Sequence, residues 1–370
     1  MTFTYKNFIV DLVYTVSANE ELLDVKIYFI DLGKNISDCG EATYIKVGND
    51  IDILIDAGEH SEVSANEVID VINKAGSDGV LDYVIASHAH SDHIGGMRYV
   101  LPKYDIKNVI EFHHKYGYDE NDSNVVGYYL KARSKADNIV TAYDLITNQG
   151  NGSSYKWIIA EGVSFTFYNS GFLNTQASDK NQQSVICVFE AHGIRVLFNG
   201  DAEEQCEVTY APLVGDVDIF KMPHHGTYNG TSTTLLQNIK PEVGIVCNGN
   251  YLGNRYGHPT YDAMSRIYNY DEEINVYAIT GATINNFTST STNGPGSSKY
   301  TLYGYKTTKR YNFYFNCTTF EEALGQRNGD ICISITSENY QITSELGING
   351  NPYEMRETNY WKEMIKYINS

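Results

Sequence analysis

A ten-residue stretch at 87–96, with the sequence SHAHSDHIGG, constrains this chain more than any other feature. It follows directly on DYVIAS at 82–87, an apolar run that predicts a buried strand. Imidazole and carboxylate groups are good ligands for divalent metal ions, and the stretch supplies four of them within six positions. Solvated histidines grouped by chance are a poor alternative for so dense a cluster behind a strand. The candidate ligands are His88, His90, Asp92 and His93.

A strand end divides these four side chains into two pairs. Alternate residues on a turn that leaves a strand can point to the same side, so His88 and His90 can share one ion. Asp92 and His93 then face a second ion. The two glycines that follow let the backbone pass close by and begin the next helix.

Two later segments repeat the arrangement of a strand followed by metal-ligand residues. Asp201 follows IRVLF at 194–198, and His224 and His225 follow VDIFK at 217–221. Each segment alone is weak evidence, since a Gly-Asp turn and paired surface histidines are both common. Together with the first cluster they supply a carboxylate that can bridge two ions and a further imidazole. Two ions about 4 Å apart can clamp the attacking and leaving oxygens of a hydrolysis.

Asp56 ends the run IDILID at 51–56 and is a further acid at a predicted strand end. It could orient a ligating histidine by accepting a hydrogen bond from the ring. The local sequence Asp-Ala-Gly supports an ordinary turn equally well. Both interpretations stay open at this point.

Strands and helices alternate along most of the chain. Short β-branched runs predict strands at 25–31, 43–47 and 51–56, and apolar residues at helical spacing predict a helix at 64–76 that Ser64 or Asn66 could cap. The second half repeats the rhythm, with a hairpin that turns at Gly193, two buried strands and two helices. Strands that arrive in groups with helices between them predict an α/β sandwich in which helices cover two sheets.

The composition of the chain divides it into four segments. Residues 1–24 form an N-terminal extension, and residues 25–286 form the main domain. Residues 287–299 are rich in Ser, Thr, Gly and Pro, which predicts a linker or long loop. Residues 300–370 are rich in Tyr and alternate as exposed strands before a final amphipathic run. We expect them to form a small β-rich appendage with a terminal helix, packed on the main body.

The charge of the chain limits its partners. Lys and Arg total 27 against 46 Asp and Glu, which gives a net charge of −19. So acidic a chain is unsuited to stable binding of long DNA or RNA duplexes, because long-range attraction to a polyanion needs a positive surface. A small anionic substrate or a short nucleic acid is compatible with this charge.

The sequence also bears on cellular location. No run approaches the roughly 18 uninterrupted apolar residues of a membrane-spanning helix. The N-terminal 21 residues lack the pattern of a secretory signal, and Asp11 interrupts their apolar run. The six cysteines form no Cys-x-x-Cys pair, which favours reduced thiols over a disulfide framework. We therefore expect a cytoplasmic protein, with a secreted protein whose leader has been removed as the alternative.

The stretch at 87–96 resembles the His-x-His-x-Asp-His signature of the metallo-β-lactamase superfamily. Over about residues 25–285, the order of motifs is most similar to the hydrolase domain of the ComEC-type DNA-uptake competence proteins and their free-standing soluble relatives. The polytopic membrane channel of the competence proteins has no counterpart in these 370 residues. Besides the 87–96 stretch, the residues that carry the resemblance are Asp56, Asn181, Ser184, Asp201, His224, His225 and His258.

This resemblance implies a fold and a metal site. The fold is a four-layer αββα sandwich with the site at one edge of two packed sheets. The cofactors are one or two divalent metal ions, zinc or manganese. Carried over residue by residue, the ligands are His88 and His90 for one ion, Asp92, His93 and His225 for the second, and Asp201 as the bridge.

Other positions stay open within the resemblance. Many superfamily members have a further histidine where this chain has Asn-Gln-Gln-Ser, with Asn181 nearest and Ser184 three residues on. Amide and hydroxyl oxygens are weaker ligands than imidazole, so the first site would be labile, filled by manganese, or filled only with substrate phosphate present. His224 is the alternative to its neighbour at 225. His258 could contact a substrate phosphate or act as a general acid, or it could simply precede a helix at Pro259.

Three functions are compatible with these residues. The first is a metal-dependent phosphodiesterase or nuclease-like hydrolase that uses a metal-activated hydroxide, with Asp92 and His258 as candidate catalytic residues. The second is a lactone, β-lactam or thioester hydrolase, although such enzymes usually retain the histidine that this chain lacks. The third is a non-catalytic metal-binding or sensing module, for which the missing histidine is the only support. Since one fold hosts many chemistries, the branch resemblance carries the preference for the first.

Overall fold

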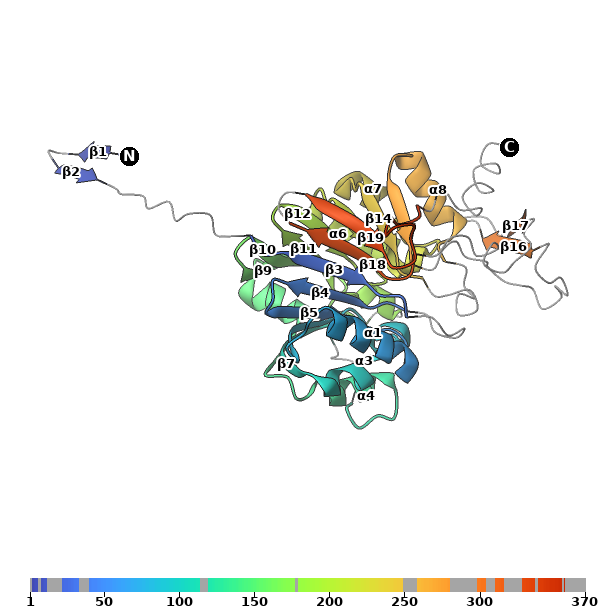
Figure 1. Ribbon diagram of the computed structural model, residues 1–370, viewed down its shortest axis with the longest axis horizontal. Coiled ribbons are helices and arrows are strands. Elements are labelled where there is room, and N and C mark those ends of the chain that lie inside the picture. The colour runs from blue at the N-terminus through green and yellow to red at the C-terminus, as the bar shows by residue number, and fades with distance from the viewer. Residues whose placement is uncertain are drawn as a thin grey trace.

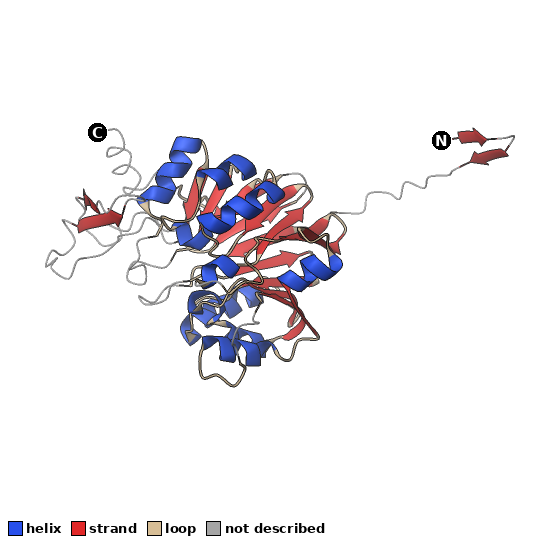
Figure 2. Cartoon of the chain, turned by 180° about the vertical axis from the view of Figure 1, so that it is seen from behind, coloured by secondary structure: helices blue, strands red, loops and turns tan. Residues whose placement is uncertain are grey.

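Two β-sheets form the centre of the molecule, and helices lie on their outer sides (Figures 1 and 2). The computed structural model describes residues 2–5, 8–11, 22–32, 40–113, 119–176, 179–248, 258–279, 298–303, 310–315, 328–336, 339–354 and 356. Within them, the arrangement confirms the predicted αββα sandwich. The boundaries of the predicted domains stay a prediction.

The first sheet has eight strands, and its second half is parallel. Strands β5, β6, β7 and β8 run parallel, whereas the pairings from β19 to β5 are antiparallel. In spatial order the strands are β19 (Tyr340–Ser344), β18 (Ile331–Ile335), β3 (Val25–Phe29), β4 (Thr43–Val47), β5 (Ile51–Ile55), β6 (Val80–Ala86), β7 (Asp105–Glu111) and β8 (Asn138–Thr141).

The second sheet has seven strands, and four of them are parallel. Strands β12 to β15 run parallel, and β9 to β12 are joined by antiparallel pairs. The hairpin between β11 and β12 turns at Gly193 as predicted, with a φ of 91° that glycine adopts without strain. In spatial order the strands are β15 (Asn275–Ala278), β14 (Val243–Val246), β13 (Ile219–Lys221), β12 (Ile194–Phe198), β11 (Ile186–Ala191), β10 (Val163–Tyr168) and β9 (Ser154–Ala160).

The helices fall into two groups. Those near the first sheet are α1 (Glu62–Lys74), α2 (Ser91–Ile94), α3 (Met97–Val100), α4 (Val125–Arg133) and α5 (Ala142–Asp144), with the short turns η1 (Leu101–Lys103) and η2 (Leu145–Gln149). Those of the second half are α6 (Glu204–Val214), α7 (Thr233–Ile239) and α8 (Tyr261–Tyr270), with the short turns η3 (Lys180–Gln183) and η4 (Pro223–Gly226).

Alternating side chains of the second sheet build two hydrophobic cores. Val196 and Phe198 of β12 belong to the core between the sheets, whereas Leu197 packs with α6, α7 and α8. This division follows from the two-residue period of a strand, which sends neighbouring side chains to opposite faces. Both faces of the sheet are therefore buried, and its strands end at a rim that the two cores hold in place.

Helix α1 begins two residues before its predicted start at 64. Its N-cap is Ser61, whose hydroxyl accepts a hydrogen bond from the backbone N–H of Ser64 at 3.3 Å. A cap hydroxyl satisfies one of the free N–H groups of the first helical turn, so the residue that makes this bond sets where the helix starts. Ser64 and Asn66 lie inside the helix instead.

Part of the predicted appendage belongs to the first sheet. Strand β18 pairs with β3, and Ile331, Ile333 and Ile335 are buried in the core between the sheets. The exposed strands expected over 331–344 therefore extend the main body, because the inward side chains of β18 continue the apolar face of β3. Strands β16 (Ser298–Tyr303) and β17 (Arg310–Phe315) pair with each other, as do β1 (Thr2–Tyr5) and β2 (Phe8–Asp11).

Two predicted segments lie mostly outside the residues that the structure describes. The predicted terminal helix lies outside the described residues, as does the predicted linker up to residue 297. Among the described helices, none has the length and apolar character needed to cross a lipid bilayer.

Candidate metal centre

The predicted ligand residues follow strands that end at one rim of the sandwich. Asp56 follows β5, the 87–93 loop follows β6, Asp201 follows β12, and the His224–His225 turn follows β13. Strands β5 and β6 are parallel neighbours, and so are β12 and β13. Because the carboxyl ends of parallel strands meet at the same edge of a sheet, residues far apart in sequence converge there.

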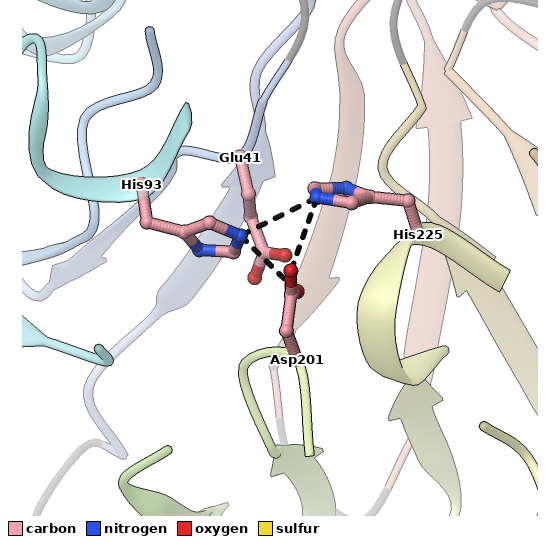
Figure 3. Close-up of side chains that lie close together, drawn as sticks. All are labelled: Glu41, His93, Asp201 and His225. Atoms are coloured by element: carbon pink, nitrogen blue, oxygen red, sulfur yellow. Dashed lines mark hydrogen bonds and ion pairs between the residues drawn. The ribbon is translucent and has the colours of Figure 1, made fainter. Parts of the chain in front are cut away.

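Asp201 lies at the centre of the cluster. Its Oδ1 lies 3.1 Å from His93 Nε2, and its Oδ2 lies 3.5 Å from His225 Nε2. The two imidazole Nε2 atoms are 3.3 Å apart (Figure 3). All three side chains are buried, and their imidazole nitrogens and carboxylate oxygens face one another within 3.5 Å.

The other predicted ligands flank this cluster. His88 Nε2 lies 3.7 Å from Asp201 Oδ2 and 3.1 Å from His90 Nδ1. On the other side, Asp92 Oδ2 lies 3.4 Å from His225 Nε2, and the Asp92 side chain is 29% exposed. Asp201 is therefore within 3.7 Å of side chains from both of the groups that the sequence assigned to separate ions.

Hydrogen bonds fix the two central imidazole rings. His93 Nδ1 donates to Asp56 Oδ2 at 2.7 Å, and His225 Nδ1 donates to the carbonyl of Cys247 at 2.7 Å. With Nδ1 occupied in this way, Nε2 of each ring is left to face Asp201. Asp56 is itself held by the N–H and hydroxyl of Ser87, at 2.8 Å and 2.5 Å. Of the two interpretations of Asp56, this geometry favours the orienting one.

Asn181 and Ser184 lie beside the centre in different roles. The hydroxyl of Ser184 accepts a hydrogen bond from the backbone N–H of Asp201 at 3.0 Å, so Ser184 holds the loop that carries the central carboxylate. The amide of Asn181 donates to Glu203 Oε1 at 3.3 Å. Its carbonyl oxygen is buried and has no hydrogen-bond partner among the described residues. Such an atom is costly to bury unless something binds it.

His224 and His258 stand farther out. His224 Nε2 lies 3.8 Å from Asp201 Oδ2, and its Nδ1 lies 3.5 Å from Glu203 Oε1. The ring of His258 stacks on that of His225, with 5.8 Å between centroids and 11° between planes. Its centroid is also 5.8 Å from that of His224. The neighbour relation of these three rings places His258 at the site, although it contacts Asp201 less directly than the central histidines.

The electrostatics of the cluster favour positive charge. Burial opposes protonation of His93 and His225, but the neighbouring carboxylates outweigh it: they raise the pKa of His225 to about 10 and that of His93 well above its usual value. Burial likewise opposes ionisation of Asp201, yet the two cationic rings lower the pKa of this carboxyl well below its usual range. In the metal-free chain, protons on the imidazole rings balance the negative charge of the carboxylates. A divalent ion bound to the same side chains would replace those protons.

His88 behaves differently from the two central histidines. Burial, together with the positive charge on His93, lowers the pKa of His88 well below its usual value. Burial also lowers the pKa of His90. Both rings are therefore neutral near pH 7, which is the form of imidazole that binds a metal ion.

Sequence reasoning missed two charged residues of the centre, Glu41 and Lys221. Lys221 Nζ forms an ion pair with Glu41 Oε2, and both side chains are buried. Lys221 Nζ also donates to the carbonyl of Gly200 at 2.6 Å and lies 3.6 Å from Asp201 Oδ1. The one available signal was a lysine at the end of the apolar run VDIFK, a strand expected to be buried. That pattern does not indicate that the lysine pairs with Glu41 or that it lies beside the metal centre.

Comparison with known proteins agrees with this fold. The family model of the metallo-β-lactamase superfamily matches residues 39–249, which is more than half of the chain. The chain therefore belongs to the metallo-β-lactamase superfamily. Within the curated proteins it is similar to Recombination protein 2 of Haemophilus influenzae, at 28% identity over 251 residues, which are 67% of this chain and 28% of that protein.

Two further similarities complete the comparison. ComE operon protein 3 of Bacillus subtilis is 29% identical over 92 residues, which are 24% of this chain and 12% of that protein. These two relatives confirm the resemblance to ComEC-type competence proteins, and the chain spans less than a third of the length of either. Among solved structures, the short form of human tRNase Z is 13% identical with a TM-score of 0.36, over 60% of this chain and 91% of that one.

Proposed function

We propose that this chain is a metal-dependent phosphodiesterase whose centre holds one or two divalent ions, zinc or manganese. The observation that carries the proposal is a pair of ligand groups that share Asp201. In each group the ligand atoms lie within 4.8 Å of one another. Imidazole nitrogen and carboxylate oxygen are the donors that such ions take in proteins, so the residues present fit the ions. When bound, the ions supply a Lewis acid that polarises a phosphoryl oxygen and lowers the pKa of water.

The first group is Glu41, His93, Asp201 and His225, and the second is His88, His90 and Asp201. We assign the ligands as the sequence predicts, with Asp92 rather than Glu41 beside His93 and His225. His88 and His90 would hold one ion, and Asp201 would be shared between the two. The buried carbonyl oxygen of Asn181, which lacks a partner among the described residues, is the donor we propose where other superfamily members have a histidine. The second ion would be held by Asp92, His93 and His225, which surround the other side of Asp201.

The remaining residues orient ligands and bind substrate. Asp56 and Ser184 keep His93 and Asp201 in place through hydrogen bonds that need no metal. Lys180 donates to the carbonyl of Ala89, between the two histidines of the 88–90 loop, at 3.3 Å. Its ammonium stands at the rim of a site rich in carboxylates, where it would contact the anionic oxygens of a phosphodiester.

His258 would contact the phosphate as a neutral hydrogen-bond donor. Burial, followed by the charge on His225, lowers the pKa of His258 well below its usual value. A ring that is neutral at pH 7 is a poor general acid, so of the two functional roles the phosphate contact is the one we propose.

The choice of a phosphodiester over an acyl substrate rests on two observations. One relative is named a recombination protein, which favours a nucleic-acid substrate. The place of the further histidine, usual in lactone, β-lactam and thioester hydrolases, is held by Asn181. The net charge of −19 favours a short single strand over a long duplex. The cytoplasmic location expected from the sequence remains a prediction.

A substrate panel tests the proposal. Protein loaded with zinc or manganese is assayed with bis-p-nitrophenyl phosphate, labelled single-stranded DNA and nitrocefin. We expect turnover of the first two and none of nitrocefin. Asp201→Asn should lower phosphodiester turnover by about 10³-fold or more, because it removes the shared ligand. The matched control is Asp216→Asn, since the side chain of Asp216 is exposed and pairs with Lys240.

Two outcomes contradict the proposal. Turnover of nitrocefin in preference to both phosphodiesters would favour the acyl-hydrolase alternative. The other outcome is a wild-type protein that binds metal stoichiometrically but whose turnover of every substrate is the same as that of Asp201→Asn and Asp92→Ala. This result would favour a non-catalytic metal-binding module.

A further inference from the structure

We propose that Lys221 and Glu41 form a positioning pair that sets the geometry of the metal centre, and that neither residue is a metal ligand. The inference rests on the proposed function, because it assumes that the centre holds a divalent ion. It goes beyond the ligand set in assigning a role to a buried ion pair that contacts the centre from below the rim, at the end of β13.

Lys221 anchors the loop that carries the shared carboxylate. Its Nζ donates to the carbonyl of Gly200, the residue before Asp201, at 2.6 Å. The same Nζ lies 3.6 Å from Asp201 Oδ1. Lys221 is also the last residue of β13, three positions before the His224–His225 turn. One ammonium group therefore fixes the start of the Asp201 loop relative to the strand that delivers His225.

Glu41 ties in the other two ligand loops through its backbone. Its N–H donates to the carbonyl of Asp92 at 2.9 Å, and its carbonyl accepts from the N–H of Gly58 at 2.8 Å. The chain beside it is pressed against the same loop, since a Cβ at Gly40 would collide with the carbonyl oxygen of Asp92. The Glu41–Lys221 contact thus joins the two loops from the first sheet to the two segments from the second.

The charges explain why Glu41 serves Lys221 and not the metal ion. The Glu41 carboxylate does lie within 4.8 Å of the ligand atoms of His93, Asp201 and His225. Figure 3 shows it beside these three, whose dashed contacts run among themselves. A lysine buried in the core needs a carboxylate partner, because an unpaired buried charge is strongly destabilising. The ammonium of Lys221 contacts Glu41 Oε2 directly and lies 3.6 Å from Asp201 Oδ1, so it would repel a metal ion on Glu41 more strongly than one on Asp201.

The two assignments of Glu41 predict opposite effects of removing Lys221. If Glu41 only positions, Lys221→Met loosens the Gly200–Asp201 loop and weakens metal binding. If Glu41 is a ligand, Lys221→Met frees its carboxylate and strengthens metal binding. Residues that orient metal ligands typically contribute 10- to 100-fold to metal affinity or activity, which sets the expected scale at about that size.

The experiment measures Co²⁺ binding to the full chain and to Lys221→Met, Glu41→Gln and the double variant. Affinity is measured by competition with a chromophoric chelator, and ligand geometry by the visible absorption spectrum of the bound Co²⁺. We expect Lys221→Met and the double variant to bind Co²⁺ about 10- to 100-fold more weakly than wild type, with a changed spectrum. The loss of Co²⁺ affinity in the double variant should be no larger than the loss caused by a single substitution, because both substitutions disrupt the same contact.

The double variant guards against misfolding, since it leaves neither charge buried alone. The matched control is Lys46→Met with Asp52→Asn, which removes another buried ion pair, with 2.7 Å between Nζ and Oδ1, on strands β4 and β5. This control should lower the midpoint of thermal unfolding and leave Co²⁺ affinity within about twofold of wild type.

Three results would overturn the inference. The first is Co²⁺ affinity and spectrum unchanged in the double variant. The second is tighter binding in Lys221→Met, which would make Glu41 a ligand. The third is absence of Co²⁺ binding by the wild-type chain, which would overturn the proposed function as well, whereas the first two leave it standing.

Discussion

Asp201 depends on its neighbours for both its position and its charge. Ser184 holds its backbone N–H, and Lys221 holds the carbonyl before it. A carboxyl so deeply buried would ordinarily be protonated, but two imidazolium rings within 3.5 Å keep its pKa low. The side chain is therefore ionised and fixed in place before any metal arrives, so binding requires little rearrangement of the centre.

Metal binding at pH 7.5 should release protons. His225 has a pKa near 10, and the pKa of His93 is raised well above its usual value, so both rings carry a proton in the metal-free chain. A metal ion requires neutral imidazole, so at least one proton leaves as the ion binds. Calorimetric titration with Zn²⁺ in buffers of different ionisation enthalpy measures this number. A binding enthalpy that is the same in every buffer would contradict it.

The role proposed for Lys180 separates binding from chemistry. Lys180→Gln removes a positive charge beside the 88–90 loop and leaves every proposed ligand residue unchanged. We expect KM for a phosphodiester to rise about 10-fold, with kcat changed less than about threefold, because the lost contact serves the bound substrate and the transition state alike. Steady-state kinetics of metal-loaded protein measures both constants. Lys240→Gln, at an exposed ion pair with Asp216, is the control. A fall in kcat at constant KM would assign Lys180 to the chemical step.

The proposed ligand residues can be selected from the sequence because their spacing is local. His88, His90, Asp92 and His93 stand within six positions of one another, and the other ligands follow predicted strands. Glu41 and Lys221 lie in ordinary surroundings, and only the folded chain shows that they form an ion pair. An ion pair between positions so far apart in the sequence leaves no local pattern. It therefore cannot be predicted from either segment alone.

At the scale of elements, the η4 turn depends on two helices. His224 and His225 have φ values of 49° and 54°, a left-handed conformation that is strained for residues other than glycine. Arg266 of α8 donates to the carbonyls of Tyr228, Gly230 and Thr231, just after the turn. Glu207 of α6 accepts from the N–H groups of Thr231 and Ser232, each at 2.7 Å. Helices α6 and α8 thus hold the segment that fixes the turn.

Glu207 should make stability depend on pH in a defined window. Burial raises the pKa of Glu207 from a usual value of 4.5 to about 7, although the hydrogen bonds that it accepts from Thr231 and Ser232 lower it. Between these two values the folded state binds more protons than the unfolded state, so stability falls as pH rises through the window. The free energy of unfolding of wild type minus that of Glu207→Gln should fall by up to about 3 kcal/mol from pH 4.5 to pH 8.

Urea unfolding at several pH values measures this difference, on metal-free samples so that ligand titration cancels between the two proteins. A difference that stays constant over the window, or that rises with pH, would contradict the assignment. In either case the pKa of Glu207 would not be raised in the folded state, where the carboxylate accepts from the N–H groups of Thr231 and Ser232 just before α7.

Most elements could be predicted from periodicity, while their ends depended on individual contacts. The strands at 43–47 and the helix over 64–74 follow apolar spacing that the structure keeps. The start of α1 was missed because three residues, Ser61, Ser64 and Asn66, all have side chains suited to an N-cap. Only the geometry of the chain that enters the helix selects Ser61.

At the scale of the whole molecule, the centre joins the two sheets. Asp56 and the 87–93 loop come from the first sheet, and Asp201 and His225 come from the second. The strands from 331–344 complete the first sheet beyond β3, so the C-terminal part of the chain supports the same sandwich (Figure 1). Their place could not be predicted because β18 pairs with a strand about 300 residues earlier, and such a register leaves no local signal.

Ile333→Ala tests whether β18 belongs to the core. Ile333 is fully buried and pairs in register with Ile27 of β3. Truncation of a buried isoleucine leaves a cavity, so we expect a loss of about 2–5 kcal/mol in the free energy of unfolding. Gln341→Ala on the exposed face of β19 should change it by less than about 0.5 kcal/mol. Equal and small effects of both variants in urea unfolding would place β18 outside the core.

The central claim is that this rim binds a divalent ion between two sheets. Anomalous diffraction from a crystal of manganese- or zinc-loaded protein, recorded on both sides of the metal absorption edge, tests it most directly. We expect an anomalous peak at bonding distance, about 2.0–2.2 Å, from His93, Asp201 and His225. A fully loaded crystal with no peak beside Asp201, or with its metal bound elsewhere on the surface, would contradict it.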